Sequence, residues 1–206
     1  MQSRVPVCVV GLNHAYERAA SVQPTPLEVE QRKRFTERMR ELIADIKPTI
    51  IASENPDTNN SELLAVYPQG DGALSVCLDI PLERKIARGL CIFRSEKHLC
   101  PYVDGIRERF WRSRLYGAVK AHPHPRILLF CGSLHLYRHN EKPVSFPDKL
   151  KASGYSVSVL DLRKDGRWNE SWVRDWKDPS PLPGTLGIPC CIDTGTFDFS
   201  GKCRMK

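Results

Sequence analysis

The sequence contains no long apolar run, no low-complexity tract and no internal repeat other than one pair of short motifs. Its apolar runs reach about seven residues, against the roughly 20 that a helix needs to cross a bilayer, so we expect no membrane span. The opening MQSRVPVCVVG has neither a small-residue cleavage site nor the extended apolar region of a signal peptide. We interpret it as a strand and expect a cytoplasmic protein.

Paired metal-binding cysteines are also missing. None of the eight cysteines forms a Cys-x-x-Cys pair, which argues against a zinc ribbon. Four of them lie inside or beside apolar runs, where cysteine behaves as a small hydrophobic residue: Cys8, Cys77, Cys91 and Cys131. We therefore expect structural thiols and not a disulfide framework.

Positive charge is concentrated in one part of the chain. The formal net charge is +7, and the window from Glu83 to Arg126 contains eleven Lys or Arg against four acidic residues. Such a window attracts nucleic acid, an acidic metabolite or phosphate, or it is simply a solvated helix face. Because no RNA- or DNA-binding signature accompanies it, nucleic acid is not the expected partner.

Apolar and amphipathic segments alternate along the first three quarters of the chain. Short apolar runs predict strands at residues 4–10, 49–53, 74–80, 126–131 and 155–162. Helical patterns fall between them, at residues 25–48, 61–67, 82–90, 103–120 and 147–153. This order predicts an α/β domain over residues 1–162, in which a mainly parallel sheet of about five strands has helices on both faces, giving three layers.

The helix at residues 25–48 has the clearest boundaries. Thr25 and Glu28 match a capping box, Pro26 takes the first helical position, and Pro48 ends the pattern. The predicted buried stripe consists of Phe35, Met39, Leu42, Ile43 and Ile46.

Residues 163–206 have a different character. They contain three tryptophans and several prolines without a sustained period. Large apolar rings need a surface on which to lie. We expect an irregular extension that packs on the α/β domain.

Two segments share one construction, an apolar run followed by Gly-x-x-His: VVGLNHAYER at residues 9–18 and LLFCGSLHLY at residues 128–137. Glycine at the end of a strand lets the backbone turn sharply, and histidine supplies a proton acceptor or a metal ligand. His14, Glu54 and His135 each follow a predicted buried strand. Because parallel strands end at a common edge, these three side chains are predicted to converge on one cleft there.

Glu54 and the segment DGIRERFWRSRL offer further chemistry. Glu54 serves as a base, as an orienter of a histidine, as the carboxylate of a two-His-one-carboxylate metal site, or only as one half of a salt bridge. If Ile106 and Phe110 face the core from a helix here, Arg107 and Trp111, four residues apart, form the neighbouring row on the helix surface. Glu108 lies beyond that row. An arginine there can clamp a carboxylate or phosphate or stabilise developing negative charge. Three other arginines are interpreted as solvated surface: Arg109, Arg112 and Arg114.

Taken together, VGLNHAYE, IIASENP, GIRERFW and ILLFCGSLHL resemble the erythromycin esterase, ChaN-like and TraB/Tiki superfamily, over roughly residues 5–162. The resemblance implies that His14 is the leading catalytic or ligand residue and that Glu54 is its acidic partner. It further implies that Arg107 and Glu108 form the helix pair and that His135 is the second histidine. Glu17 resembles the acidic residue that follows the first histidine in esterase-like members. Trp111 stands where the family usually has methionine, and Leu12 where esterase-like members often have an acidic residue.

Two functional classes follow. The first is a hydrolase of a small anionic, ester or amide substrate. In its metal-free version His14 is the general base, Glu17 or Glu54 orients it, and Arg107, paired with Glu108 on its helix, or His135 stabilises the oxyanion. In its metal version one divalent Mn, Co, Zn or Fe ion is bound by His14, Glu54 and His135. As a binding module it holds haem, as ChaN-like proteins do, or an anionic ligand. Candidate ligands for the second class are Tyr16, Tyr137, His122, His124 and His139. The sequence does not predict an oligomeric state.

Overall fold

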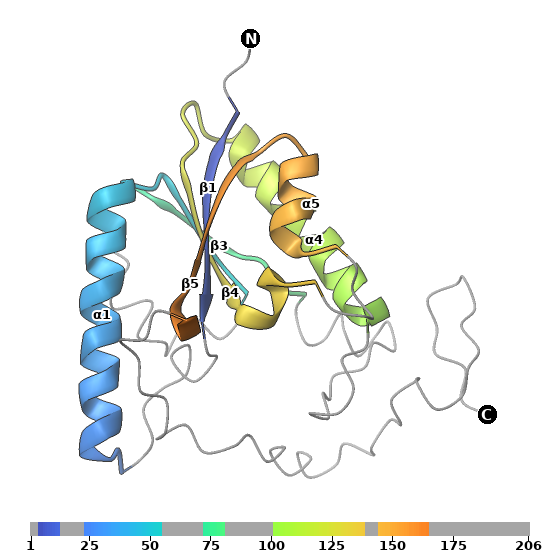
Figure 1. Cartoon of the computed structure of the whole chain (residues 1–206). Coiled ribbons are helices and arrows are strands. Elements are labelled where there is room, and N and C mark those ends of the chain that lie inside the picture. The colour runs from blue at the N-terminus through green and yellow to red at the C-terminus, as the bar shows by residue number, and fades with distance from the viewer. Residues whose placement is uncertain (1–3, 13–22, 55–71, 81–100, 139–143, 165–206) are drawn as a thin grey trace, which may run out of the picture.

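The computed structural model describes residues 4–12, 23–54, 72–80, 101–138 and 144–164, with only the backbone described for residues 101–104. Five strands within these ranges form one parallel sheet with the order β3-β2-β4-β1-β5 (Figure 1). Its strands are β1 (Pro6–Leu12), β2 (Ile50–Ser53), β3 (Leu74–Cys77), β4 (Ile127–Gly132) and β5 (Ser156–Asp161). The α/β prediction with five parallel strands is confirmed.

The two strands that carry the Gly-x-x-His motifs lie side by side. β1 pairs in parallel with β4, so that Gly11 lies opposite Cys131 and Leu12 opposite Gly132. All six residues of β4 are buried, as are the last four of β1. A continuous apolar run is what a strand covered on both faces requires, which is why these strands can be recognised in the sequence.

Helix α1 (Pro26–Ile46) begins and ends close to the predicted residues. The Thr25 hydroxyl accepts from the Glu28 N–H at 3.1 Å, and Lys47 caps the other end with φ 47°. Glu28 does more than the capping box predicts, because its carboxylate accepts from Arg32 Nε at 3.0 Å one turn later. Of the predicted stripe, three residues are buried and the last two half-buried: Phe35, Met39 and Leu42, then Ile43 and Ile46.

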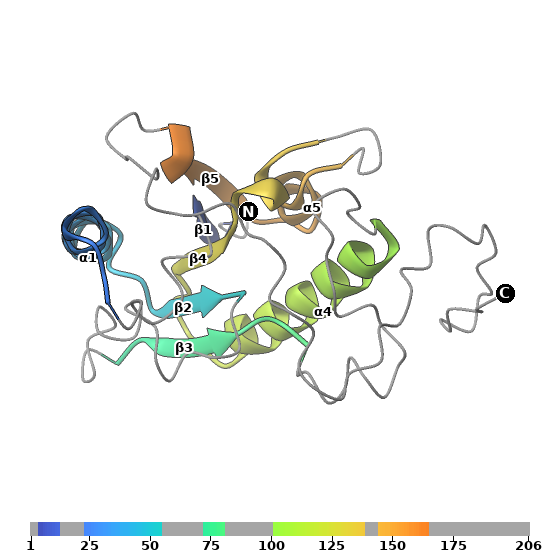
Figure 2. The ribbon, with the colours of Figure 1, turned by 90° about the horizontal axis from the view of Figure 1, so that it is seen from below.

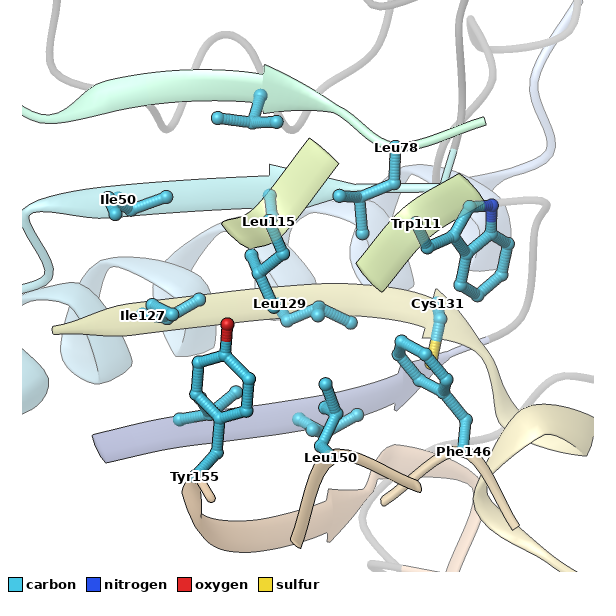
Figure 3. Packing of buried hydrophobic residues seen from close by; sticks show 14 of the residues in the cluster. Ile50, Leu78, Trp111, Leu115, Ile127, Leu129, Cys131, Phe146, Leu150 and Tyr155 are labelled. Carbon is cyan, nitrogen blue, oxygen red and sulfur yellow. The ribbon is translucent and has the colours of Figure 1, made fainter. Parts of the chain in front are cut away.

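Helices cover both faces of the sheet, as expected for three layers. α1 lies on one side, and α4 (Pro101–Lys120) and α5 (Phe146–Ala152) lie on the other (Figure 2). Under α4 and α5 the core is built around Trp111, whose ring meets Phe146 edge-on at 5.2 Å between centroids (Figure 3). Trp111 is fully buried, so it is the anchor of α4 on the sheet.

The orientation assumed for α4 holds only in part, because Phe110 packs against the core cluster without being fully buried. Ile106 and Phe110 are only half-buried, whereas Arg107 and Glu108 are buried beside Trp111. The expectation assumed that apolar side chains take the core face. In the folded chain Arg107 and Glu108 also face inward, because side chains from other elements neutralise their charges there.

Several expectations concern residues outside the described ranges. These are the helices at 61–67 and 82–90, all of the extension after residue 164, and Cys91. In the described part, Cys131 is buried and Cys8 and Cys77 are half-buried, and burial raises the pKa of the Cys8 thiol. No described helix combines the length and apolar character that crossing a membrane demands.

Candidate functional site at the carboxyl edge of the sheet

Glu54 is the first residue after β2 and is almost fully buried, at 4% exposure. Its backbone N–H donates to Phe130 O at 3.0 Å, continuing the ladder to β4. Its carboxylate accepts from Arg107 Nη2 at 2.6 Å and from the Gly132 N–H at 2.8 Å. The glutamate therefore connects the end of β2 to α4 and to the end of β4.

Arg107 holds a second carboxylate, that of Asp79. The guanidinium donates from Nε to Asp79 Oδ1 at 2.9 Å and from Nη2 to Oδ2 at 3.1 Å. Asp79 is 5% exposed and also accepts from the Ile80 N–H at 2.9 Å. Asp79 was not predicted as a site residue, because the apolar pattern predicts a strand as far as residue 80. β3 ends at Cys77, so Asp79 lies two residues beyond a strand end, much as Glu54 lies one residue beyond β2, and that position could have found it.

His135 belongs to the short 3-10 helix η3 (Ser133–Leu136), directly after β4, and is 1% exposed. Its Nδ1 lies 2.9 Å from Glu108 Oε1, and its Nε2 lies 3.5 Å from Glu54 Oε1. An ionised carboxylate can only accept a hydrogen bond, so the short contact with Glu108 places a proton on Nδ1. The predicted pair from α4 and the predicted strand-end histidine thus meet, with Nε2 directed toward Glu54.

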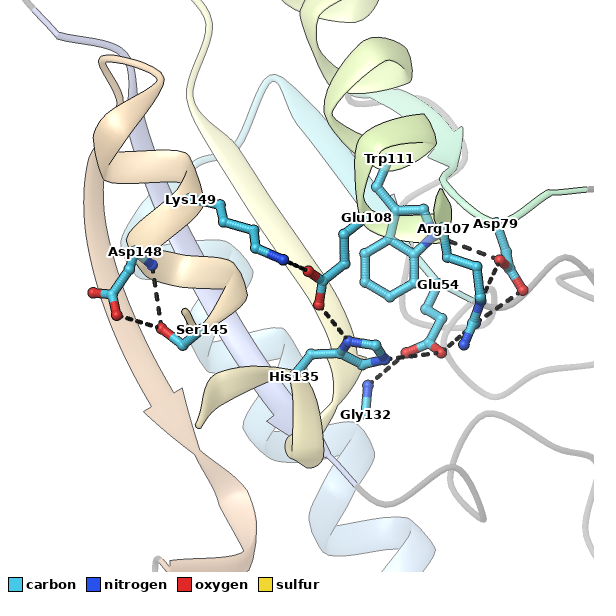
Figure 4. A network of polar contacts seen from close by, with 10 residues as sticks. All are labelled: Glu54, Asp79, Arg107, Glu108, Trp111, Gly132, His135, Ser145, Asp148 and Lys149. Atoms are coloured by element: carbon cyan, nitrogen blue, oxygen red, sulfur yellow. Dashed lines mark hydrogen bonds and ion pairs between the residues drawn. The ribbon is translucent and has the colours of Figure 1, made fainter. Parts of the chain in front are cut away.

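Lys149 of α5 completes the described network. Its Nζ donates to Glu108 Oε2 at 2.5 Å, and its side chain is 27% exposed (Figure 4). Nothing in the sequence distinguishes Lys149 from other helical lysines, so pattern reasoning could not have found it. The network now runs from the surface inward through Lys149, Glu108, His135, Glu54, Arg107 and Asp79.

Burying this network costs free energy that the stability of the fold does not require. Removing a carboxylate and a guanidinium from water costs several kcal/mol per ion, and apolar residues of the same volume often serve stability as well or better. Six ionisable residues from the ends of three strands and from two helices nevertheless meet here, and five of them are buried. Such a concentration at the carboxyl edge of a parallel sheet is typical of a functional site.

The two motif glycines work differently from the expectation. Gly132 has φ −57°, a conformation open to any residue, and no positive φ is found at Gly11. What Gly11 supplies is space, because a Cβ there would lie 2.3 Å from Leu136 Cδ1 and 3.1 Å from Ser133 Cα. The missing side chain of β1 lets η3 fold back closely over the end of the sheet, and His135 is carried on that turn.

Some predicted residues are not brought to this edge. His14 and Glu17 lie outside the described residues, as do Tyr16 and His139. His122 and His124 lie between α4 and β4, at the opposite end of β4 from His135. Tyr137 lies near the site, but its hydroxyl donates to Asp161. Of the other arginines, Arg109 and Arg114 are exposed, as expected, and Arg112 is half-buried.

The described donors do not fit a metal ion. In the part of the chain that the structure describes, no three His, Cys, Asp or Glu side chains are grouped to hold one. Glu54 and His135 approach each other, but Glu54 Oε1 already accepts from the Arg107 guanidinium at 2.6 Å, and a divalent cation on that oxygen would be repelled. The third predicted ligand, His14, is outside the described ranges.

Comparisons of the chain with protein-family models, with curated proteins and with solved structures found no match. The resemblance to the erythromycin esterase, ChaN-like and TraB/Tiki superfamily therefore stays a prediction from sequence motifs.

Proposed function

We propose that the chain is a hydrolase in which His135, held by Glu108, acts as the acid/base group toward a small ester or amide. One observation carries the proposal: a buried imidazole has its Nδ1 fixed by a carboxylate at 2.9 Å, while Nε2 lies on the side of a second carboxylate, Glu54. A carboxylate on one ring nitrogen sets the tautomer and stabilises the imidazolium that forms when the other nitrogen takes a proton.

The reaction follows from that tautomer. Nε2 of His135 takes a proton from water, and the hydroxide formed adds to the carbonyl carbon of the substrate. The imidazolium is stabilised by Glu108 at Nδ1 and by Glu54 near Nε2. When the bond from the carbonyl carbon to the leaving group breaks, Nε2 returns the proton to that group.

Arg107 acts here through the carboxylates that it holds. Its described hydrogen bonds go to Glu54 and Asp79, so it fixes Glu54 beside the imidazole and partly neutralises it. Among the described side chains of the network, three carboxylates stand against the two fixed cations Arg107 and Lys149. This balance favours a neutral ester or amide over an anionic substrate.

The metal-free version is the one we propose, because Glu54, one of the three expected metal ligands, already binds the Arg107 guanidinium through Oε1 at 2.6 Å. His14 and Glu17 enter from the sequence alone, as a second acid/base pair. Leu12, two residues before His14, pairs with Gly132, the residue whose N–H donates to Glu54.

The test is hydrolysis of a panel of p-nitrophenyl esters and anilides by the purified chain and by His135→Gln, with His124→Gln as the matched control. His124 is an exposed histidine at the opposite edge. We expect a loss of about 100-fold or more in kcat for His135→Gln, in the range of a lost general base, and no change for His124→Gln. Hydrolysis that survives in a folded His135→Gln would contradict the assignment.

Two further measurements make a negative result informative. Elemental analysis of wild type, His14→Ala and His135→Ala tests the metal version, and stoichiometric metal that both substitutions remove would overturn the metal-free proposal. Diethyl pyrocarbonate labelling with mass spectrometry tests whether reagents reach His135, which is 1% exposed. If His135 stays unlabelled in the native chain and no substrate is hydrolysed, the hydrolase proposal fails.

A further inference from the structure

A further carboxylate at the carboxyl edge, outside the network described above, contacts the turn that carries His135. Asp161 is the last residue of β5, and its side chain is 6% exposed. Its Oδ1 accepts from Ser133 Oγ at 3.1 Å and from the Arg163 N–H at 3.0 Å, and its Oδ2 accepts from the Tyr137 hydroxyl. Asp161 lies opposite Gly11 of β1, the residue over which η3 folds.

The two hydroxyl donors flank the histidine symmetrically in the sequence. Ser133 stands two residues before His135, and Tyr137 two residues after it. One carboxylate therefore ties down both sides of η3, while Glu108 holds the imidazole itself. The backbone and the ring of His135 are fixed from opposite sides of the turn.

A carboxylate is well suited to this contact, because all three of its partners can donate. A carboxylate has two acceptor oxygens, whereas an amide of the same shape would replace one acceptor with a donor. The nearest cationic atom in the described contacts of Asp161 is Arg163 Nε, at 3.7 Å, beyond hydrogen-bond distance. Lys164 lies instead over the Tyr137 ring, with Nζ 4.2 Å from its centroid. The Asp161 side chain is 6% exposed and is held mainly by hydroxyl and amide donors. Burying a charge in this way costs free energy that attaching an edge strand does not require.

We propose that Asp161 is a positioning residue for His135, and that it acts by holding Ser133 and Tyr137 on either side of it. The effect on catalysis rests on the hydrolase proposed above. The effect on the geometry of His135 does not depend on that proposal. Edge strand β5 thereby takes part in the site through its last side chain.

The direct test is NMR of histidine labelled with nitrogen-15 at the ring. In the wild type the His135 signals should report the form with the proton on Nδ1. In Asp161→Asn we expect a second or exchange-broadened set of His135 ring signals, because η3 is released on one side. Ser158→Ala is the control on the same strand: Ser158 is exposed, its hydroxyl makes a long 3.5 Å contact to Val7 O, and the His135 signals should not move.

A mutant cycle separates positioning from simple loss of stability. Ser133→Ala and Tyr137→Phe each remove one of the two hydroxyls, and together they should disturb the His135 signals at least as much as Asp161→Asn, which keeps one accepting oxygen. Adding Asp161→Asn to that double variant should change them no further, since contacting residues are not additive. Unchanged His135 signals in Asp161→Asn, or full additivity in the cycle, would overturn the proposal.

Activity gives a second readout if the hydrolase assay succeeds. Asp161→Asn should lower kcat by about 100-fold with little change in KM, as expected for a small displacement of an acid/base group. If the hydrolase proposal fails, the NMR experiment still decides whether Asp161 positions His135. The two failures are therefore distinguishable.

Discussion

The two ends of the sheet differ in the kind of contact that completes them. At the amino end, Thr49 Oγ1 donates to His124 O at 3.2 Å and accepts from the Arg126 N–H at 2.9 Å, while Arg126 Nε donates to Lys47 O at 2.8 Å. These contacts are exposed and use backbone groups. At the carboxyl end the contacts are buried and join charged side chains to one another, as in the pairs of Arg107 with Glu54 and Asp79.

This difference shows what a fold of this kind needs for stability. The amino end demonstrates that backbone hydrogen bonds and a threonine suffice to organise the ends of strands. The buried charges at the carboxyl end exceed that need, and their burial costs free energy. We therefore attribute them to function, and each of the following substitutions tests the contrast between the two ends.

The largest effect is expected from Arg107→Met. It leaves two buried carboxylates, Glu54 and Asp79, without the guanidinium that neutralises them, which should lower the free energy of unfolding by about 3–5 kcal/mol. Urea unfolding followed by circular dichroism measures this. Arg109→Met removes an exposed arginine from the same helix and should change stability little. Equal losses in the free energy of unfolding of the two variants would mean that Glu54 and Asp79 do not need the guanidinium to neutralise them.

A smaller effect is expected from Gly11→Ala. The new Cβ would overlap Leu136, and overpacking of this kind costs about 1–3 kcal/mol. Calorimetric unfolding should show the loss. Leu136→Ala opens the same space, so the double variant should be more stable than the sum of the two single losses implies. Strict additivity would show that Gly11 does not support η3 in this way.

At the amino end, Thr49→Val should cost only about 1 kcal/mol, the usual net value of a hydrogen bond that water can replace. It should also leave the His135 signals and any hydrolysis unchanged. A loss comparable to that of Arg107→Met would remove the contrast between the two ends.

The smallest effect concerns Asp148, which lies at the first turn of α5, away from the buried network. The hydrogen bond from Ser145, followed by that from Arg138, holds the pKa of its carboxyl below the usual 3.8. Because the folded pKa is the lower one, the stabilisation is fully present above 3.8 and is lost as the pH falls through the folded value. Asp148→Asn should therefore be less stable than wild type at pH 7, and the difference should vanish in acid.

Its control is Asp45→Asn, at an exposed position on α1. A stability difference between wild type and Asp148→Asn that persists unchanged well below pH 3.8 would contradict the assigned cause.

How far the sequence predicts this molecule depends on how local each signal is. The strands and α1 could be predicted because continuous apolar runs and a Thr25 cap are local features. Glu54 and His135 could be predicted because they follow such runs directly. The burial of Arg107 and Glu108 could not be predicted because it depends on partners 27 to 53 residues away in the sequence. Lys149 could not be predicted because its local sequence resembles that of any helical lysine.

The strand order also has a consequence for how the chain must fold as it is made. β1 is complete by Leu12, yet its neighbours β4 and β5 begin at Ile127 and Ser156. At the usual speed of synthesis of about 5–20 residues per second, the apolar segment PVCVVGL waits roughly 6 to 23 s for its first partner strand. Nascent chains should therefore depend on chaperones during that interval, and folding should be slow because the central pairing is non-local.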